Sequence, residues 1–294
     1  MVDESTLAEI DLPEAKLCAE YLGLVKLKGM VDSWLKYVDP ETHRIHGYVN
    51  SCGAVTGRMT HNKPNLAQIP SLKIARECFT VEDGNVLVGC DASGLELRCL
   101  AHYMNDDNYT KQILEGDIHS FNQHAAGLPE RFMAKTMIYG LIYGAGDAKL
   151  GQIVGGGAKE GKKIRDTFLT QLPALRKLIE KAKGIAQRTK RINGIDGRMI
   201  KVDEDYKVLN RLLQSCGAIV MKVAVRNCCH KLDELGIFYK LVAQVHDEVQ
   251  IEARPEDAEV VGQVARQAII DAGVELNMRC PMDAEYRIGA NWSG

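Results

Sequence analysis

One stretch, residues 86–98, restricts what this chain can fold into more than any other. Its apolar first part, residues 86–90, ends abruptly at an acid, Asp91. Beyond the acid, leucines and an alanine recur with helical spacing, and Glu96 and Arg98 are expected on the side away from them. The pattern predicts a buried strand that leads through Asp91 into a strand-to-helix turn. A carboxylate at the end of a rigid strand is well placed to hold a metal ion.

A second acidic site lies near the end of the chain. Two runs rich in β-forming residues flank His246, Asp247 and Glu248, which predicts a hairpin with the acids at its tip. If the tip is buried, two acids are costly unless a metal ion compensates their charge, whereas at a solvated tip they cost nothing. Because one acid cannot hold a catalytic metal ion alone, we expect Asp91 and Asp247 to be partners.

Length and composition are those of an ordinary soluble globular protein, with 294 residues and a formal net charge of −2. Basic residues gather between Lys159 and Lys201, where few acids oppose them. Such a run is typical either of a solvated helix face or of a surface for a polyanion. The nine cysteines include no Cys-x-x-Cys pair, which predicts free thiols in a reducing compartment. Residues 1–12 do not have the pattern of a signal peptide, and no apolar run approaches the length of a membrane span, so we expect a cytoplasmic protein without a membrane partner.

Periodicity and turn residues predict the remaining elements. Helices are expected over residues 13–38, 109–114, 119–126, 129–143, 206–235 and 255–272, with two more between 160 and 190. A short strand is expected over 46–50, a hairpin turn over 193–197 and a last short segment over 279–292. Residues 53–70 form a loop rich in glycine, asparagine, threonine and cations. Such a loop is either a surface excursion or a segment that grips the backbone of a ligand.

The helix expected over 129–143 carries Arg131, Lys135 and Tyr139 at steps of four residues, which places all three on one face. Two cations followed by an aromatic ring suit a triphosphate with a base or sugar stacked beyond it. An exposed helix face with ordinary basic residues is the commoner case. The glycines at 155–157 lack the Lys-Ser/Thr pair of a phosphate-binding loop, and we give them no such role.

Taken together, these features favour one reaction class. Two aspartates borne on strands can hold two Mg²⁺ ions, which prefer carboxylate oxygen. Two such ions clamp the attacking and leaving oxygens of an in-line phosphoryl displacement. Charge neutralisation and positioning supply most of the catalysis in phosphoryl transfer, and the basic helix would contribute both. A two-metal nuclease would share the carboxylates but would not need a triphosphate-binding helix.

These motifs, in this order, resemble those of the family A DNA polymerases, and within that family those of the phage type. The matching segments are residues 91–98 for motif A, Arg131, Lys135, Tyr139, Tyr143 and Gly144 for motif B, residues 245–248 for motif C, and residues 56–58, 64–66 and 69–70 for the primer-template loop. The resemblance extends from about Pro13 to Trp292.

The resemblance implies an α+β fold, with a palm of antiparallel sheet and helices and a mostly helical fingers subdomain. It implies a helix following the thumb at 1–40, the first part of the palm with the primer-template loop at 41–104, the fingers at 105–209, and the second part of the palm with the His-Asp-Glu hairpin at 210–294. The implied activity is template-directed DNA synthesis, in which a nucleotide passes from a dNTP to a primer 3′-OH and pyrophosphate is released.

The resemblance also implies a metal site. Asp91 and Asp247 would be ligands of two Mg²⁺ ions, for which Mn²⁺ is a possible substitute, and the carbonyl of Ala92 would be a third ligand. Glu248 would lie beside them near the primer end, in a supporting role.

Nucleotide binding would fall to motif B and its surroundings. Arg131, Lys135 and His119 would bind the triphosphate of the incoming dNTP, with Lys135 placed to act as a general acid toward pyrophosphate. Tyr139 would influence discrimination against 3′-deoxy substrates, and we expect its hydroxyl to allow ready incorporation of dideoxynucleotides. Tyr143 would stack near the template base.

Two further sets of roles follow from the resemblance. Glu96 would be a steric gate that occupies the space of a ribose 2′-OH. Arg58, Asn210 and Gln214 would donate hydrogen bonds in the minor groove, whose acceptors are nearly the same for every correct base pair. His246, in motif C, would also contact DNA.

The chain departs from the family's pattern in two ways. Gly94 stands where bacterial members carry a glutamine, as is usual for the phage type. The family normally places a 3′–5′ exonuclease domain and most of a helical thumb ahead of the region that this chain resembles. We therefore expect a polymerase without its own thumb and exonuclease, in the bacterial or phage-infected host cytosol, with a second chain supplying one or both. An expressed fragment and a truncated inactive copy are alternatives.

Other functions make different demands on the sequence. A single-subunit RNA polymerase or a reverse transcriptase shares a palm with two aspartates, but Glu96 and the motif B spacing favour deoxynucleotides and a DNA template. A non-catalytic nucleic-acid-binding subunit would be indicated by loss of Asp91 or Asp247, and both are present.

Overall fold

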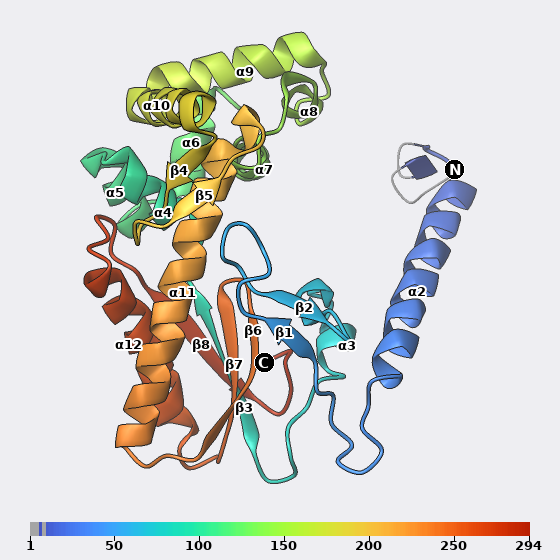
Figure 1. Cartoon of the computed structure of the whole chain (residues 1–294). Helices are drawn as coiled ribbons and strands as arrows, with labels where there is room; N and C mark the ends of the chain where they lie inside the picture. Colours follow the sequence, from blue (N-terminus) through green and yellow to red (C-terminus); the bar gives the residue numbers. More distant parts are fainter. Residues whose placement is uncertain (1–5, 8–9) are drawn as a thin grey trace.

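The strand predicted before Asp91 is an inner strand of the main sheet. The computed structural model describes residues 6–7 and 10–294. Four antiparallel strands pair in the order β6-β7-β3-β8 (Figure 1), and their bounds are β3 Val86–Ala92, β6 Tyr239–Val245, β7 Glu248–Ala253 and β8 Ala284–Gly289. Val88, Cys90 and Ala92 are fully buried on one face, and Leu87 packs into a separate small core on the other. Both faces of β3 are thus apolar up to Asp91, near its C-terminal end.

Two long helices cover one face of this sheet. Helix α12 (Ala258–Glu275) packs along β3 and β8, and α11 (Val208–Glu234) packs against α12 and rises past the sheet toward the upper helices (Figure 1). Asp205–Glu234 has the length and mean hydropathy of a membrane span, and 67% of its most apolar 18-residue window is buried inside the protein. By this measure our expectation that no apolar run reaches that length is wrong; burial among other helices accounts for the apolar composition.

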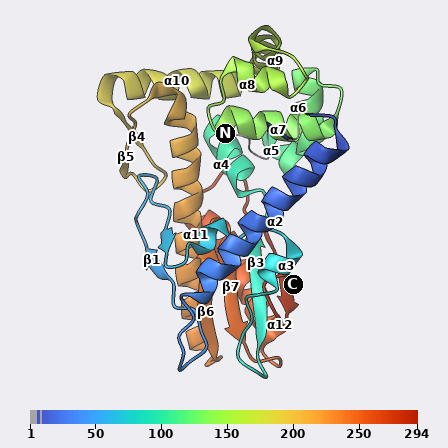
Figure 2. The ribbon, with the colours of Figure 1, turned by 90° about the vertical axis from the view of Figure 1, so that its right-hand side faces the viewer.

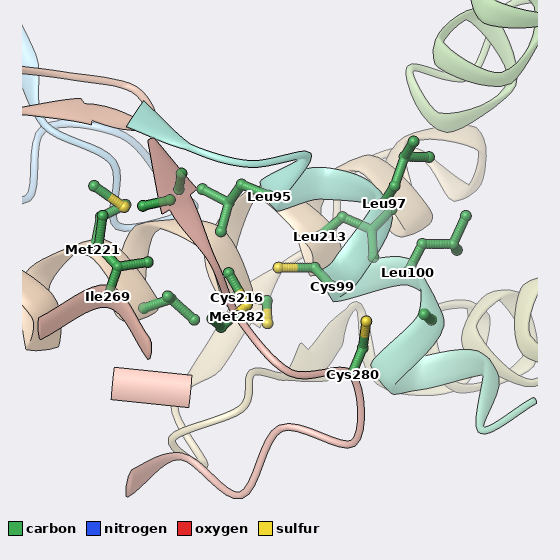
Figure 3. Close-up of a cluster of buried hydrophobic side chains, with 14 of the residues drawn as sticks. Leu95, Leu97, Cys99, Leu100, Leu213, Cys216, Met221, Ile269, Cys280 and Met282 are labelled. Carbon is green, nitrogen blue, oxygen red and sulfur yellow. The ribbon is translucent and has the colours of Figure 1, made fainter. Parts of the chain in front are cut away.

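Helix α4 (Leu95–Met104) joins the sheet to the upper helices and is buried on nearly every side. Figure 3 shows its side chains gathered with Leu213 and Cys216 of α11 and with Cys280 and Met282 of the C-terminal segment. The prediction that Arg98 lies on an exposed face is wrong. Its side chain is buried, and the guanidinium donates hydrogen bonds to the carbonyl oxygens of Ser93, at 2.7 Å, and Pro281. These carbonyls satisfy the buried charge and tie the turn after Asp91 to the segment before β8.

Short helices and one small hairpin form the upper part of the molecule (Figure 1). Their bounds are α5 Asp107–Leu114, α6 Ile118–Ala126, α7 Arg131–Ile142, α8 Asp147–Gln152, α9 Ala158–Gln171, α10 Pro173–Thr189, β4 Arg191–Asn193, β5 Met199–Lys201 and η2 Asp205–Lys207. Asp106 and Asp117 cap the N-termini of α5 and α6 with their side chains, and Gly127 ends α6 in the left-handed conformation. The helices and the hairpin expected here are present.

The N-terminal region runs along the other side of the sheet. Its elements are α2 Pro13–Leu35, β1 Tyr48–Asn50, β2 Thr60–Asn62, η1 Leu66–Gln68 and α3 Lys73–Arg76. Helix α2 stands apart from the rest in Figure 1 and crosses in front of the sheet in Figure 2, and its buried side chains are Ala15 and Trp34. Strand β2 was not predicted within the loop of residues 53–70; its three residues pair with β1, and such a short polar strand has no apolar alternation to reveal it.

The mixture of helices with an antiparallel sheet is the α+β class that we expected. The division into segments 1–40, 41–104, 105–209 and 210–294 stays a prediction, and residues 1–5 and 8–9 of the first segment lie outside the described residues.

The close approach of α8 and α9 depends on glycine. A Cβ atom at Gly161 would overlap the carbonyl oxygen of Asp147 and lie 2.6 Å from the amide nitrogen of Gly151. We predict that Gly161→Ala lowers the free energy of unfolding by about 1–3 kcal/mol, because backbone atoms must move to admit the methyl group. Urea denaturation measures the change.

Gly184 is the matched control, since it lies within α10 and a Cβ there would meet nothing within 4 Å. Gly184→Ala should raise the free energy of unfolding by about 0.5–1 kcal/mol, the usual gain of alanine over glycine inside a helix. Equal effects of the two substitutions would contradict this account of the α8–α9 contact.

Candidate active site

Strand pairing brings together the two acids singled out in the sequence. Asp91, the penultimate residue of β3, lies directly opposite Glu248, the first residue of β7. Asp247 belongs to the two-residue loop between β6 and β7, in which His246 takes a positive φ of 56°. The backbone N–H of Ala92 donates a hydrogen bond of 2.9 Å to the Asp247 carbonyl oxygen. The backbones at the two acids are therefore fixed to each other.

The charge at this point is uncompensated. Partial burial, the nearby carboxylate of Asp247 and, to a smaller extent, that of Glu248 raise the pKa of the Asp91 carboxyl to about 7, and Arg76 opposes the rise. Within the described residues, no hydrogen bond or ion pair reaches the side chains of Asp91 or Asp247. A bound cation would relieve the repulsion between them.

Glu248 is held in a different way. Its Oε1 accepts hydrogen bonds from Trp292 Nε1, at 2.7 Å, and from Gln250 Nε2, at 2.5 Å. Its Oε2 accepts a longer one of 3.4 Å from Arg76 Nη2. Protein donors thus occupy both oxygens, which fits the supporting role expected for this residue. Sequence reasoning missed Trp292, Gln250 and Arg76, because none of them stands in a motif that marks it.

Asp91 and Asp247 suit Mg²⁺ better than they suit a metal ion that takes all its ligands from protein side chains. Across residues 6–7 and 10–294, no group of three or more His, Cys, Asp or Glu side chains is arranged to hold a metal ion. Mg²⁺ usually takes one or two carboxylates and completes its shell with water and substrate phosphates. Asp91 and Asp247 are a donor set of that kind. The carbonyl of Ala92 as a third ligand stays a prediction.

Three of the predicted residues form one cluster around Glu96, which lies in the first turn of α4. Its Oε1 accepts a hydrogen bond of 3.0 Å from Arg58 Nη2, in the loop between β1 and β2. The hydroxyl of Tyr143, at the end of α7, lies 3.0 Å from both carboxylate oxygens. Burial, followed by the Glu96 charge, raises the pKa of Tyr143 to about 12. The ion pair and the hydroxyl contact together fix the Glu96 side chain.

The predicted face of α7 runs from the acids to a cationic group. Tyr139 is partly buried, and burial together with the charges of Glu96 and Asp247 raises the pKa of its hydroxyl. At the other end of the helix, burial and the charges of Arg131 and Lys135 lower the pKa of His119. Asp117 accepts hydrogen bonds from the His119 backbone N–H and from Arg131. Lys135 stands one helical turn from Arg131, so the three residues predicted to bind a triphosphate lie near one another.

Arg131 has a partner that the sequence analysis did not predict. Its Nε and Nη2 donate hydrogen bonds of 2.6 and 2.9 Å to the two carboxylate oxygens of Asp117, which also caps α6. The bond from Arg131 holds the pKa of Asp117 well below its usual range. The N-cap position of Asp117, two residues before His119, is the one signal in the sequence that could have indicated it.

The remaining DNA-binding candidates are more dispersed. Arg58 and His246 line one small hollow together with His61, Lys222 and Gln244. Asn210 and Gln214 lie one turn apart on α11 and are partly exposed. The Asn210 side-chain nitrogen is buried without a hydrogen-bond partner among the described residues, so its donors are not used within the fold.

Part of the basic run between Lys159 and Lys201 faces a broad hollow. The hollow lies between α10, the β4–β5 hairpin and α4, and its basic lining residues are Lys177, Lys181, Lys190, Arg191, Lys201 and Arg279. A role as a surface for a polyanion stays a prediction.

Comparison with known proteins relates this geometry to a family. The chain is 41% identical to the DNA-directed DNA polymerases of Enterobacteria phage T3 and Escherichia phage T7, over 99% and 100% of its length, and in each case it covers 48% of the relative. It is 30% identical, over 95% of its length, to the thermostable DNA polymerase I of Thermus aquaticus, of which it covers 36%. The chain thus spans about half the length, or less, of these relatives.

A solved structure agrees with the sequence matches. The POL domain of Pol1 from M. smegmatis, in complex with DNA primer-template and dNTP, superposes with a TM-score of 0.88 at 25% identity, covering 99% of this chain and 55% of that one. The family model for DNA polymerase family A matches residues 1–294. The chain belongs to DNA polymerase family A, and its relatives in phages T3 and T7 make it similar to the phage type.

Proposed function

We propose that this chain catalyses template-directed DNA synthesis, transferring a nucleotide from a dNTP to a primer 3′-OH with release of pyrophosphate. The observation that carries the proposal is the pair of acids, Asp91 and Asp247, whose side chains have no protein partner among the described residues although the backbone holds them together. A cationic group formed by His119 of α6 and by Arg131 and Lys135 of α7 is gathered around Asp117 and the first turns of α7. The solved relative from M. smegmatis holds primer-template DNA and dNTP, which supports the same ligands here.

Each part of the site has a task in this reaction. Asp91 and Asp247 would hold two Mg²⁺ ions, or Mn²⁺ in their place, which supply charge neutralisation at the reacting phosphate. Arg131, Lys135 and His119 neutralise and orient the triphosphate, and Lys135 donates a proton to the leaving pyrophosphate. Lys135 is exposed, so substrate can reach it. For Arg131, the bidentate contact with Asp117 leaves Nη1 for a phosphate oxygen.

The sugar is selected by a rigid side chain. Glu96 is held by Arg58 and by Tyr143, so its carboxylate cannot easily move aside for a ribose 2′-OH. Arg58, Asn210, Gln214 and His246 would contact the duplex, with minor-groove donors checking the geometry of the pair rather than its sequence.

We also propose that the chain works with a further polymerase segment in the bacterial or phage-infected host cytosol. The support is α2, where Leu17, Tyr21 and Leu24 are 60–69% exposed. Their spacing puts them on one face of the helix, where a thumb or exonuclease segment, on a second chain or on this one, would find apolar surface. Processive synthesis by this chain alone, with no co-purifying polymerase segment, would count against a separate partner.

The first prediction concerns the metal-binding acids. Asp247→Ala should reduce primer extension on a DNA template with Mg²⁺ and dNTPs by about 10³-fold or more, because metal clamping contributes several kcal/mol to the transition state. Gel-resolved extension measures the loss. The control is Asp271→Ala, which removes an exposed acid of α12 and should leave extension unchanged.

Two outcomes of that experiment carry different meanings. Undiminished extension by Asp247→Ala would contradict the proposed mechanism. A wild-type chain that binds dNTP but does not extend the primer would mean that another polymerase segment must complete the enzyme.

The second prediction tests the sugar gate. Glu96→Ala should reduce discrimination against ribonucleotides by about 10–200-fold, since opening space for one small group is worth roughly 1–3 kcal/mol. Competing dNTP and rNTP incorporation at one template position measures the ratio. Glu96→Gln keeps the volume of the side chain and should retain most of the discrimination; equal losses in both variants would argue against a steric role.

The third prediction concerns Tyr139. We expect the wild-type chain to incorporate dideoxynucleotides readily, because the phenolic hydroxyl can replace the missing 3′-hydroxyl of the substrate in the local hydrogen-bond network. Tyr139→Phe should discriminate against dideoxynucleotides more strongly than the wild-type chain, by about tenfold or more, because the free energy of one hydrogen bond to a charged group corresponds to a factor of that size. Single-turnover incorporation of dNTP and ddNTP gives the ratio. A Phe variant that discriminates no better than its parent would refute the claim.

A further inference from the structure

Trp292, from the C-terminal segment, reaches into the candidate active site. Its ring is only 6% exposed and packs in a small core with Leu87 of β3 and Val245 of β6. The indole Nε1–H donates the 2.7 Å hydrogen bond to Glu248 Oε1. Tryptophan has a single side-chain donor, and in Trp292 this donor binds the carboxylate of Glu248, the residue opposite Asp91.

The same ring also affects the second oxygen of Glu248. The guanidinium of Arg76 lies over the Trp292 ring, 5.2 Å from its centroid, and its Nη2 reaches Glu248 Oε2 at 3.4 Å. Trp292 therefore donates directly to one carboxylate oxygen and supports the cation that approaches the other. Gln250 adds a donor to the first oxygen. Charge-assisted hydrogen bonds of this kind restrict both the position and the orientation of the carboxylate.

Trp292 is itself held rigidly. Its backbone N–H donates to the carbonyl oxygen of Phe79 at 3.0 Å, and Thr80 pairs with Asn291 in an isolated bridge. The Phe79 ring meets Trp292 edge to face with centroids 5.7 Å apart. A donor fixed on both its backbone and its ring can set the position of its acceptor rather than follow it.

We propose that Trp292 is a positioning residue for nucleotidyl transfer that acts through Glu248. By occupying Oε1 and supporting Arg76 at Oε2, it keeps the third carboxylate fixed beside Asp91 and Asp247 and prevents it from joining them as a ligand. A loosened Glu248 would compete for the same ions and disturb their placement. The inference rests on the proposed function, and it assigns no contact between Trp292 and the substrate.

The test begins with Trp292→Phe in the whole chain, which keeps an aromatic ring and removes the N–H. We expect kcat for single-nucleotide primer extension to fall about tenfold, part of the value of a hydrogen bond to a charged group, while KM for dNTP stays within about twofold. The KM is spared because the triphosphate-binding residues lie on α6 and α7, away from Trp292. Tyr286→Phe is the matched control. It removes the 2.5 Å hydrogen bond from Tyr286, on β8 of the same sheet, to Glu259 on α12, and it should not change kcat.

A double-mutant cycle separates positioning from general loss of structure. If Trp292 acts through Glu248, Trp292→Phe should cause no further loss of kcat in a Glu248→Ala background. Equal losses in both backgrounds, or no loss in either, would overturn the inference. Urea denaturation of each variant identifies loss of folding. If Trp292→Phe does not fold, the emission of Trp292 in a folded Glu248→Gln chain decides whether the two residues are in contact.

A spectroscopic measurement tests the contact without activity. The chain has two tryptophans, so Trp34→Phe leaves Trp292 as the only indole emitter. Adding Glu248→Gln should shift the emission maximum of Trp292, because the charged acceptor of its N–H becomes neutral. An unchanged spectrum would overturn the contact itself. A wild-type chain that neither binds dNTP nor extends primers would overturn the proposed function and, with it, the catalytic part of the inference. The emission shift would still decide whether Trp292 holds Glu248.

Discussion

The antiparallel pairing of β3 with β7 is the constraint on which the rest of this structure depends. It sets Asp91 against Glu248 and ties the backbone of Ala92 to that of Asp247, although the two acids are distant in the sequence. The carboxylates of Asp91, Asp247 and Glu248 repel one another at this point. The pairing persists because Val88 and Cys90, side chains of the same β3, are fully buried in the core. A slip of one residue would turn these side chains to the other face and move the acid into the core, so the hydrophobic face fixes the register and with it the site.

The carboxylates near the β3–β7 pairing fall into two groups, those with hydrogen-bond donors on their oxygens and those without. Glu252 is fully buried and paired with Arg44, at 2.8 Å, and with other donors; Glu248 and Glu96 likewise have donors on their oxygens. Within the described residues, Asp91 and Asp247 have none. Glu252 is fully buried and needs such partners, whereas Asp91 and Asp247 keep contact with solvent and have none among the described residues. That difference, rather than the number of acids, is what marks the pair as the place for a cation.

Much of the fold and of the site follows from short-range pattern, and what does not follow depends on distant partners. The strand at Asp91, the hairpin at Asp247 and the face of Arg131, Lys135 and Tyr139 could be predicted because period and turn chemistry are local properties. The burial of Arg98 could not be, since carbonyl oxygens at Ser93 and Pro281 satisfy its charge and neither is marked in the sequence. Asp117 and Trp292 were missed for the same reason: each acquires its role from a residue brought to it by folding.

A row of three aromatic rings links helix α2 to the carboxylate of Glu248. Trp34, one of the two buried side chains of α2, meets Phe79 edge to face at 5.1 Å, and Phe79 meets Trp292 at 5.7 Å. Because α2 has little other apolar contact with the sheet, its position depends on this row, and the last ring of the row holds Glu248. These edge-to-face contacts join α2 to the carboxylate of Glu248 through one continuous path of packed side chains.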